Sequence, residues 1–444
     1  MLKRSFTVMT AGMMLLAACS NGGTPAANEA NPLAGGATPA PVPEEKQEPI
    51  ELMFWNSSSG GTEQGFMDTV GNAVKQKFPH ITPKYIPTGK GTLMPDLIAA
   101  GTTPDIVMSS LPGIFSGYLA NGMQYDMTEQ LNKYKLDLNQ FEPTTIALIK
   151  QISNGAMFGL PYGSNTTHLL YNRDIFDKFG VAYPTDGMTW DDIYELAKKM
   201  TRTEGGVHYR GFASSLEHLE MTNQLSFSLV DPKTKKSTYA SDEKWRTFVD
   251  NLVRFYQIPG NGVDDKTVSQ AAQLDAFQKE GTVAMYAGIV VPAESVTVNW
   301  DIVRLPEFSS ARGIGSQPYP SYMMITGTSK HKDNAFKVIQ YLTTDEEYLT
   351  SRAKRGAMSA VKNPKVIQAF GHDLPHWQGR NILKARFPEK LANPSVYTEF
   401  NSVALTKYTA NMNAFLTGKI PDTNTALRMM SEQADQAIAD AMKK

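Results

Sequence analysis

The chain has 444 residues, of which 41% are hydrophobic and 20% are charged, and its formal net charge is −1. This length exceeds what one hydrophobic core usually organises, so we expect two domains, while the charge balance excludes the strong positive field that nucleic-acid binding needs. The single cysteine, Cys19, excludes intrachain disulfides and a zinc site built from thiolates.

The N-terminus has the pattern of an export signal. Lys3 and Arg4 form a positive region, and residues 5–16 are uncharged and mostly apolar. A helix needs about 20 residues to cross a bilayer, so this shorter stretch predicts a signal-peptide core. It ends in Leu16-Ala17-Ala18-Cys19, which resembles the lipobox of bacterial lipoproteins, where a peptidase cleaves before a cysteine that carries a diacylglyceryl group. A plain secretory signal with an incidental cysteine is the alternative.

Residues 20–49 predict a flexible tether. Sixteen of these thirty residues are Pro, Ala or Gly, and they show no periodic apolar pattern. Such a composition favours a partly extended chain rather than a packed element. We therefore expect a lipid anchor at Cys19, residues 1–19 as signal peptide and lipobox, and a folded part held at the outer face of the cell membrane, or facing the periplasm if there are two membranes.

The first folded region predicts strands alternating with helices. An apolar run at residues 50–55 predicts a buried strand, and a polar loop with two glycines follows it. A helix is expected over 63–78, a strand over 81–86, a helix over 94–100 and a strand over 105–108. This alternation indicates βα units on a largely parallel sheet.

The remainder of the chain predicts more helix. Thr189 and Asp192 have the spacing of a capping box at the start of a helix. Two further strands are expected over 281–286 and 300–305. From Asp333 onward the pattern predicts helices and loops, and the chain ends in an amphipathic helix with an apolar face formed by Leu427, Met430, Ala434, Ala437 and Ala441. We find no internal repeat.

An exported, lipid-anchored carbohydrate-active enzyme, either a glycoside hydrolase or a lyase, is the main alternative to a binding protein. A glycosidase needs two carboxylates about 5–10 Å apart, and the chain has 44 acidic residues, so the sequence does not single out a pair. The nucleophile elbow G-x-S-x-G is absent, and three Ser-x-x-Lys matches lack their partner motifs.

Metal and phosphate motifs are equally incomplete. His372 and His376 have helical spacing, but Pro375 between them breaks the helix that would align both rings, which favours a polar loop. Residues 87–91 lack the upstream glycine and the Ser or Thr after Lys90 that a phosphate loop requires. We therefore expect no catalytic residues, no metal and no cofactor.

Several short segments carry a resemblance to one family. They are Phe54-Trp55 and residues 99–107, 120–128, 158–162, 170–174, 189–192, 277–285, 300–306 and 341–344. In this order they resemble the family 1 extracellular solute-binding proteins, the group that includes maltose-binding protein. The resemblance covers about residues 50–350 and becomes looser in the helical tail.

The resemblance implies an α/β, two-lobed periplasmic-binding-protein-like fold. Each lobe would be a mostly parallel sheet flanked by helices, with the ligand cleft between the lobes. The first lobe would comprise residues 50–163 and 309–349, and the second lobe residues 164–305 and 350–444. The implied function is that of a monomeric binding protein that delivers a small solute, expected to be a mono- or oligosaccharide, to the permease subunits of an ABC importer.

The resemblance also implies ligand residues in loops that follow strands. Hydroxyl and amide groups match sugar hydroxyls as donors and acceptors, and aromatic faces cover the apolar side of a pyranose. Trp55, Tyr319 and Tyr322 also fit ordinary core positions. The implied residues are Trp55, Asn56, Ser57 and Ser58 after the first strand; Ser109 and Ser110 after the third; Tyr162, Ser164 and Asn165 at the first crossover; Gly288 in the second lobe; and Tyr319 and Tyr322 after the third crossover.

Two departures bear on the solute. Ile289 and Val290 stand where maltose-binding protein presents a tryptophan, and Ser109 stands at a second such position. A site with fewer stacking tryptophans suits a smaller or more polar solute, and the sequence leaves the charge of that solute open.

Overall fold

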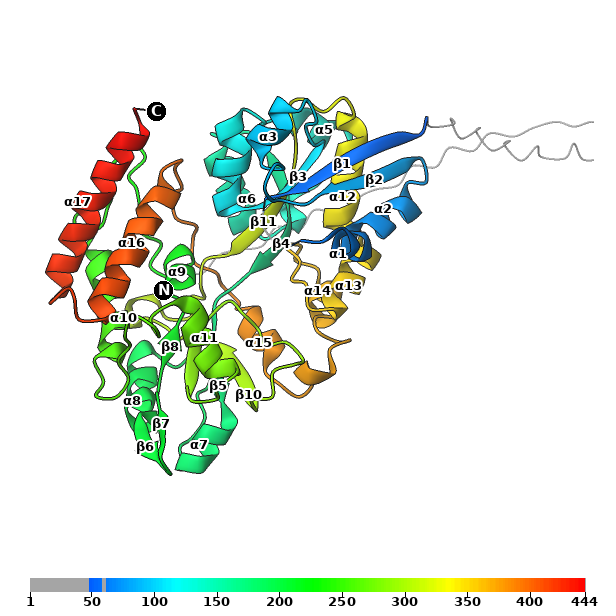
Figure 1. Ribbon diagram of the computed structural model, residues 1–444. Coiled ribbons are helices and arrows are strands. Elements are labelled where there is room, and N and C mark those ends of the chain that lie inside the picture. Colours follow the sequence, from blue (N-terminus) through cyan, green and yellow to red (C-terminus); the bar gives the residue numbers. More distant parts are fainter. Residues whose placement is uncertain (1–47, 58–60, 444) are drawn as a thin grey trace, which may run out of the picture. The chain divides into compact units, whose positions relative to one another are not determined.

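The computed structural model describes residues 48–57 and 61–443, within a compact unit that runs from Glu48 to Lys444 (Figure 1). The predicted signal peptide with Cys19, residues 20–47 of the predicted tether, and Ser58 lie outside the described residues.

The first sheet has five strands in the order β2-β1-β3-β11-β4. Strand β1 pairs in parallel with β2 and β3, whereas β11 is antiparallel to both β3 and β4. The three strands predicted over 50–108 are confirmed. The strands are β1 (Ile50–Asn56), β2 (Ile81–Ile86), β3 (Ile106–Ser110), β4 (Gly159–Asn165) and β11 (Tyr319–Ile325).

Helices pack around this sheet, and together they form what we call the first lobe. The helix predicted over 63–78 is present, but one π-helical turn interrupts it, so that it consists of α1, η1 and α2. The elements are α1 (Glu63–Phe66), η1 (Met67–Gly71), α2 (Asn72–Lys77), α3 (Met94–Ala99), α4 (Leu111–Gly113), η2 (Ile114–Tyr118), η3 (Leu119–Asn121), α5 (Thr128–Lys133), η4 (Leu138–Gln140), α6 (Pro143–Ile152), α12 (Lys332–Thr344), α13 (Glu346–Lys354) and α14 (Pro364–Gln368).

The second sheet has four strands in the order β10-β5-β9-β8. Only β8 and β9 pair in parallel; β5 is antiparallel to both of its neighbours. The expectation of mostly parallel sheets is therefore wrong: both sheets are mixed, because distant segments supply the neighbouring strands. The strands are β5 (His168–Asn172), β8 (Ala213–Ser214), β9 (Met285–Gly288) and β10 (Trp300–Arg304), with a separate hairpin of β6 (Arg202–Glu204) and β7 (Val207–Tyr209).

One predicted strand is displaced. The strand expected over 281–286 starts at Met285 and ends at Gly288. Gly281 has a positive φ of 65°, which breaks the extended conformation, and Val283 makes only an isolated bridge to Arg210. Residues 283–286 are buried, but pairing with β5 begins only at Met285.

The helices around the second sheet complete the second lobe. The capping box is confirmed: Thr189 Oγ1 accepts from the Asp192 N–H at 3.1 Å, and Asp192 Oδ2 accepts from the Thr189 N–H at 2.8 Å. The elements are α7 (Arg173–Phe179), α8 (Trp190–Met200), α9 (Leu216–Met221), α10 (Glu243–Tyr256), α11 (Gln270–Gln278), η5 (Ser309–Ala311), η6 (Pro375–Trp377), α15 (Ile382–Arg386), α16 (Asn401–Leu416) and α17 (Thr423–Ala441).

The hydrophobic cores divide the chain differently from the predicted lobe boundaries. Leu349 and Ala353 of α13 belong to the core of the first sheet, as do Val361 and Val366. The first lobe thus continues beyond residue 349, because a boundary there would cut through α13. Phe308, in contrast, packs in the core of the second lobe. Strands β4 and β11 carry the chain from one lobe toward the other (Figure 1).

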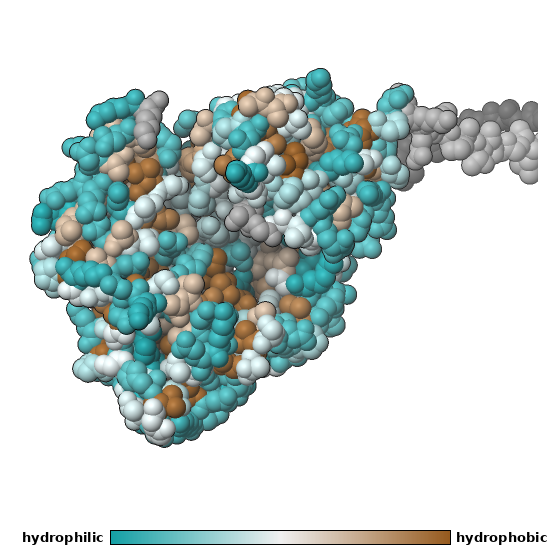
Figure 2. Space-filling model, in the orientation of Figure 1, coloured by the Kyte–Doolittle hydropathy of each residue, from teal (hydrophilic) through white to brown (hydrophobic). Residues whose placement is uncertain are grey.

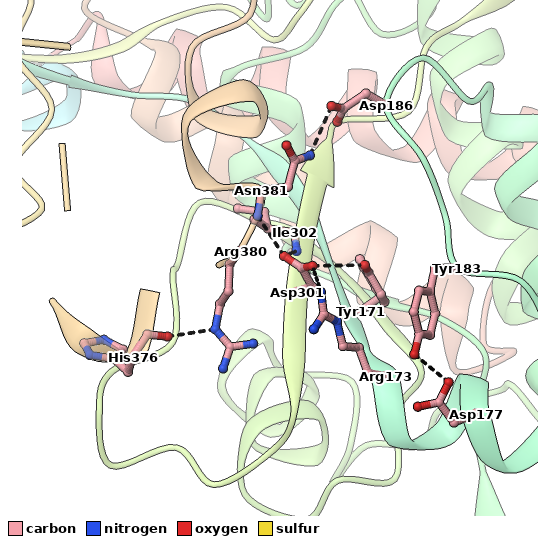
Figure 3. A network of polar contacts seen from close by, with 10 residues as sticks. All are labelled: Tyr171, Arg173, Asp177, Tyr183, Asp186, Asp301, Ile302, His376, Arg380 and Asn381. Carbon is pink, nitrogen blue, oxygen red and sulfur yellow. Dashed lines mark hydrogen bonds and ion pairs between the residues drawn. The ribbon is translucent and has the colours of Figure 1, made fainter. Parts of the chain in front are cut away.

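A polar network fixes the segment before α15 to the second sheet (Figure 3). At its centre is Asp301 of β10, which is 4% exposed. One carboxylate oxygen accepts from the backbone N–H groups of Asn381 at 3.0 Å and Ile302 at 2.9 Å. The other accepts from the Tyr171 hydroxyl at 3.2 Å and pairs with Arg173. Both oxygens of this buried carboxylate therefore have partners.

Candidate functional site

Two serine hydroxyls meet at the carboxyl ends of β1 and β3. Ser57 Oγ and Ser109 Oγ lie 2.6 Å apart, and the Ser57 N–H donates to the Met108 carbonyl at 2.9 Å. A Cβ at Gly113 would clash with both hydroxyls. The absence of a side chain at Gly113 therefore leaves room for the serine pair that the resemblance implied as part of the site.

Tyr319 brings the two lobes together at the start of β11. It stands opposite Asn165 in the sheet register; burial raises the pKa of its hydroxyl, and the nearby Ser110 side chain acts in the opposite direction. The ring of His218, on α9 of the second lobe, meets the Tyr319 ring edge-on at a centroid distance of 6.0 Å. Burial lowers the pKa of His218 to about 4, and its Nδ1 lies 2.7 Å from Ser215 Oγ. His218 is therefore neutral at neutral pH.

Arg386 links the first crossover to the second sheet. Its guanidinium is buried and donates to Asn165 Oδ1 at 2.8 Å and to the Ile289 carbonyl at 3.1 Å. The Thr166 hydroxyl donates to the Arg386 carbonyl at 2.9 Å. Burial lowers the pKa of Arg386 to about 10, which leaves it charged at neutral pH. The oxygen of Asn165 thus has a partner within the protein.

The remaining implied residues of the crossover are also half-buried or buried. The Ser164 hydroxyl is buried and has no hydrogen-bond partner among the described residues, although its N–H donates to the Met358 carbonyl at 3.3 Å. The Tyr162 carbonyl accepts from Arg352 at 3.1 Å, and the same guanidinium lies 5.5 Å from the Tyr162 ring centroid. Gly288 ends β9 at a point where a Cβ would clash with the neighbouring Tyr286 ring.

Two of the implied aromatic residues pack in the core of the first lobe. Trp55 is 2% exposed, and its indole N–H donates to the Thr92 carbonyl at 2.9 Å. Tyr322 is 0% exposed, and its hydroxyl donates to the Thr145 carbonyl at 2.7 Å. Both belong to the first-lobe core cluster, so in this conformation they present no free ring face. Asn56 is half-buried, and its carbonyl accepts from the Thr88 hydroxyl.

Sequence reasoning missed a small pocket between α4–η2 of the first lobe and α9 and α16 of the second. Its volume is about 20 Å³. Glu220 on α9 lines it, and its position beside Leu216 and Leu219 on the buried face of that helix was a readable signal. The rings of Phe115 and Tyr397 stack at 6.5 Å beside it. The lining residues are Pro112, Phe115, Glu220, Met221, Leu229, Tyr397, Asn401, Ser402 and Leu405.

The larger surface hollows lie elsewhere. Figure 2 shows this face of the molecule hollowed near the place where β4 and β11 leave the first sheet in Figure 1. One pocket of about 430 Å³ lies within the second lobe between α8, α10 and η5, where Arg254 pairs with Asp191 at 2.5 Å. None of the residues implied by the resemblance lines that pocket.

The described residues form neither a metal-binding cluster nor a membrane-spanning helix. Within residues 48–57 and 61–443, no three His, Cys, Asp or Glu side chains gather closely enough to hold a metal ion. His376 belongs to the short helix η6 and does not share a continuous helix with His372. No described helix has the length and apolar character needed to cross a membrane.

Comparison with known proteins gives one consistent result. The family described as bacterial extracellular solute-binding protein matches residues 59–348. The sn-glycerol-3-phosphate-binding periplasmic protein UgpB of Brucella abortus is 25% identical over 277 residues, 58% of this chain and 62% of that protein. The match thus spans less than two thirds of this relative's length.

Solved structures share the fold. A sugar transporter from Rhizobium etli in an open conformation superposes with a TM-score of 0.70 at 20% identity, over 87% of this chain and 99% of the other. An ABC substrate-binding protein from Listeria monocytogenes in complex with cycloalternan gives 0.70 at 19% identity, over 88% and 99%. At these identities the likeness shows the two-lobed periplasmic-binding-protein fold, with mixed sheets and helices in each lobe.

Proposed function

Because this chain belongs to the family of bacterial extracellular solute-binding proteins, we propose that it captures a small polyhydroxylated solute between its lobes and delivers it to an ABC importer. The observation that carries the proposal is the meeting of hydroxyl groups from the first lobe with α9 of the second. Tyr319 from the first lobe meets His218 of α9 edge-on, and Ser110 lies near the Tyr319 hydroxyl. A mono- or oligosaccharide is the proposed solute, which agrees with the sugar and cycloalternan named for the two structural relatives.

The chemistry of this junction suits a neutral solute rich in hydroxyls. Serine and tyrosine hydroxyls both donate and accept, and neutral His218, whose Nδ1 is paired with Ser215, offers its Nε2. The unpartnered hydroxyl of Ser164 adds a further polar group at the crossover. Trp55 and Tyr322 are left out of the proposed site because their side chains are buried in the core. Tyr319, half-buried and beside His218, is the proposed aromatic contact.

We propose no chemical step. A binding protein must release its solute unaltered, whereas a carbohydrate-active enzyme would cleave it. Incubation of purified residues 20–444 with an oligosaccharide mixture should leave every mass unchanged in mass spectrometry. Cleavage products that disappear when candidate carboxylates are removed would favour the enzyme instead.

Binding itself is tested by a thermal-shift screen of the same protein. The panel contains mono-, di- and oligosaccharides, polyols, amino acids and, because of the name of the curated relatives, sn-glycerol 3-phosphate. A solute at 100 times its dissociation constant stabilises the folded state by about 2.7 kcal/mol, which a melting curve resolves. A shift with saccharides or polyols supports the proposal; a shift with amino acids alone contradicts the proposed solute class.

The membrane attachment is a separate part of the proposal. We propose that Cys19 carries two acyl chains of a diacylglyceryl group, since a single chain holds a protein only marginally. Cys19→Ala should move the protein from the membrane fraction to the soluble fraction after cell lysis. A variant that sediments with the membrane as completely as the parent would place the anchor elsewhere.

A further inference from the structure

Glu220 is a buried carboxylate without a partner. It is 0% exposed, and neither of its carboxylate oxygens has a hydrogen-bond partner among the described residues. Burial raises its pKa well above the ordinary value, and the neighbouring Glu217 acts in the same direction. A buried polar group in this state is costly to a fold, and such groups are few in native proteins. Its presence at the lobe junction therefore needs an explanation.

The donors that surround Glu220 are used elsewhere. The charge of Glu220 contributes to the raised pKa of three tyrosines. The hydroxyl of each tyrosine nevertheless has a backbone carbonyl as its acceptor. Tyr239 donates to Ala404 at 2.8 Å. The other two hydroxyls lie 3.2 Å from the Met221 carbonyl for Tyr397 and 3.5 Å from the Leu216 carbonyl for Tyr408. The described residues thus supply neither a hydroxyl nor a cation to this carboxylate.

Asn401 presents a matching unpartnered donor to the same pocket. Its side-chain oxygen accepts from the Thr398 N–H at 2.8 Å and from the Thr398 hydroxyl at 3.0 Å. These two bonds fix the orientation of the amide. Its Nδ2 is buried and has no partner in the described part of the chain. The pocket therefore offers an acceptor from Glu220 and a donor from Asn401.

The Glu220 carboxyl and the Asn401 amide together favour a hydroxyl group as the occupant of the pocket. A hydroxyl can donate to Glu220 and accept from Asn401 at once, whereas an ammonium group has no acceptor for the amide N–H. The volume of about 20 Å³ suits one oxygen-sized group, since a water needs roughly 10–15 Å³ on this measure. The walls are apolar and come from both lobes: Pro112 and Phe115 from the first, Met221 and Leu405 from the second.

We propose that Glu220 and Asn401 form a subsite that binds one hydroxyl of the captured solute at the lobe junction. The source of this hydroxyl rests on the proposed function; the unpaired state of the two side chains does not. Because the pocket has walls from both lobes, a hydroxyl held there favours the arrangement in which α9 and η2 lie together. A bound water offers the same chemistry, and the experiment separates it from the solute.

The test uses Glu220→Leu and Glu220→Gln in the protein of residues 20–444, with Glu204→Gln as the control. Glu204 is an exposed carboxylate in the β6–β7 hairpin and does not line the pocket. The probes are D-glucose, D-mannitol, maltose, cycloalternan and sn-glycerol 3-phosphate. Melting temperatures are measured without probe, and dissociation constants are measured by calorimetry for each probe that shifts the parent protein.

We expect Glu220→Leu to raise the melting temperature of the unliganded protein, because an apolar side chain replaces an unpaired carboxylate in an apolar pocket. We expect the same variant to weaken binding about ten- to hundredfold. Glu220→Gln retains an acceptor and should lose less affinity. Glu204→Gln should change neither quantity.

Three results bear on the alternatives. A lower melting temperature in Glu220→Leu overturns the proposal, because it means that a water or another group already satisfies the carboxylate. A higher melting temperature with unchanged affinity also overturns it, since the solute then does not reach Glu220. If no probe shifts the parent, the proposed function fails for these solutes, while a higher melting temperature in Glu220→Leu still supports an unpaired polar subsite.

Discussion

Asp301 and Glu220 are two buried carboxylates in the same lobe with opposite surroundings. Asp301 has partners on both oxygens, from two backbone N–H groups, a tyrosine hydroxyl and Arg173 (Figure 3). Glu220 is buried at least as completely, yet neither oxygen has a partner in the part of the chain that the structure describes. Both positions are enclosed by helices and by the second-lobe core, so burial alone does not distinguish them.

The difference in hydrogen-bond partners assigns Asp301 a structural role and agrees with the binding role proposed for Glu220. The network of Asp301 connects β10 to the segment before α15, and it stabilises the lobe because both oxygens of the buried carboxylate have partners. The pocket of Glu220 lies instead where the lobes meet, among apolar walls. Groups held unsatisfied at such a place cost stability that selection for structure alone would remove.

The largest change in stability is expected at Asp301, whose carboxylate has partners on both oxygens. Asp301→Ala should destabilise the protein by about 3 kcal/mol, because it leaves Arg173, Tyr171 and two backbone donors without their acceptor. Urea unfolding monitored by circular dichroism measures the change. The exposed-site control, Glu204→Gln, should stay within about 0.5 kcal/mol of the parent. A loss below about 1 kcal/mol in Asp301→Ala would contradict a structural role for the network.

Glu220, whose carboxylate has no partner among the described residues, predicts that the stability of the folded protein falls as pH rises. The pKa of Glu220 is raised in the folded state, so above pH 4.5, its ordinary value, the unfolded chain ionises first and stability falls as pH rises. The groups facing it are Glu217, Tyr239, Tyr397 and Tyr408. Glu220→Gln removes this titration, so its stability relative to the parent should grow with pH by up to about 1.4 kcal/mol per unit.

Urea unfolding of both proteins between about pH 4 and pH 7 measures this difference. Below pH 4.5 the carboxyl is protonated in both states, and the gap between the two proteins should become constant. A gap that is flat across the whole range would show that Glu220 titrates normally in the folded protein.

The smallest effects are expected at Asn165 of the crossover. Its side-chain oxygen has a partner within the protein, as in Asp301, and its amide N–H is proposed to bind the solute, as in the Glu220 pocket. Asn165→Ala should cost about 1 kcal/mol of stability, because buried Arg386 loses an acceptor. It should also weaken solute binding about tenfold if its amide N–H donates to the solute. Asn165→Asp retains an acceptor for Arg386 and removes that donor. We expect this second variant to regain stability without regaining affinity; full recovery of affinity would remove Asn165 from the proposed site.

Local features were predictable from the sequence, and pairing between distant segments was not. Strand β1, helix α3 and the Thr189–Asp192 capping box depend on residues within one element, and all three were predicted. The mixed second sheet depends on β10 meeting β5 across more than a hundred residues. The position of the first-lobe core beyond residue 349 likewise depends on α13 packing on a distant sheet.

Some residues of the candidate site were predictable from the sequence, and others depend on contacts between distant segments. Ser57, Ser109, Ser110 and Tyr319 lie at the ends of strands; the hydroxyls of Ser57 and Ser109 form a hydrogen-bonded pair, and Ser110 lies close enough to Tyr319 to affect the pKa of its hydroxyl. Trp55 and Tyr322 lie on central strands of the first sheet, where both faces are covered, so their rings are buried. The Glu220 pocket is formed by residues from both lobes and from the C-terminal helices, so no single sequence motif could predict it.

The most direct test is a crystal structure of the protein with whichever probe of the thermal-shift panel binds most tightly. We predict the solute between the lobes, with one hydroxyl oxygen within hydrogen-bond distance of both the Glu220 carboxylate and Asn401 Nδ2. Other hydroxyls should lie against Ser110 and Tyr319. A solute bound in the second-lobe groove beside Arg254, or a water between Glu220 and Asn401 with the solute elsewhere, would contradict this assignment.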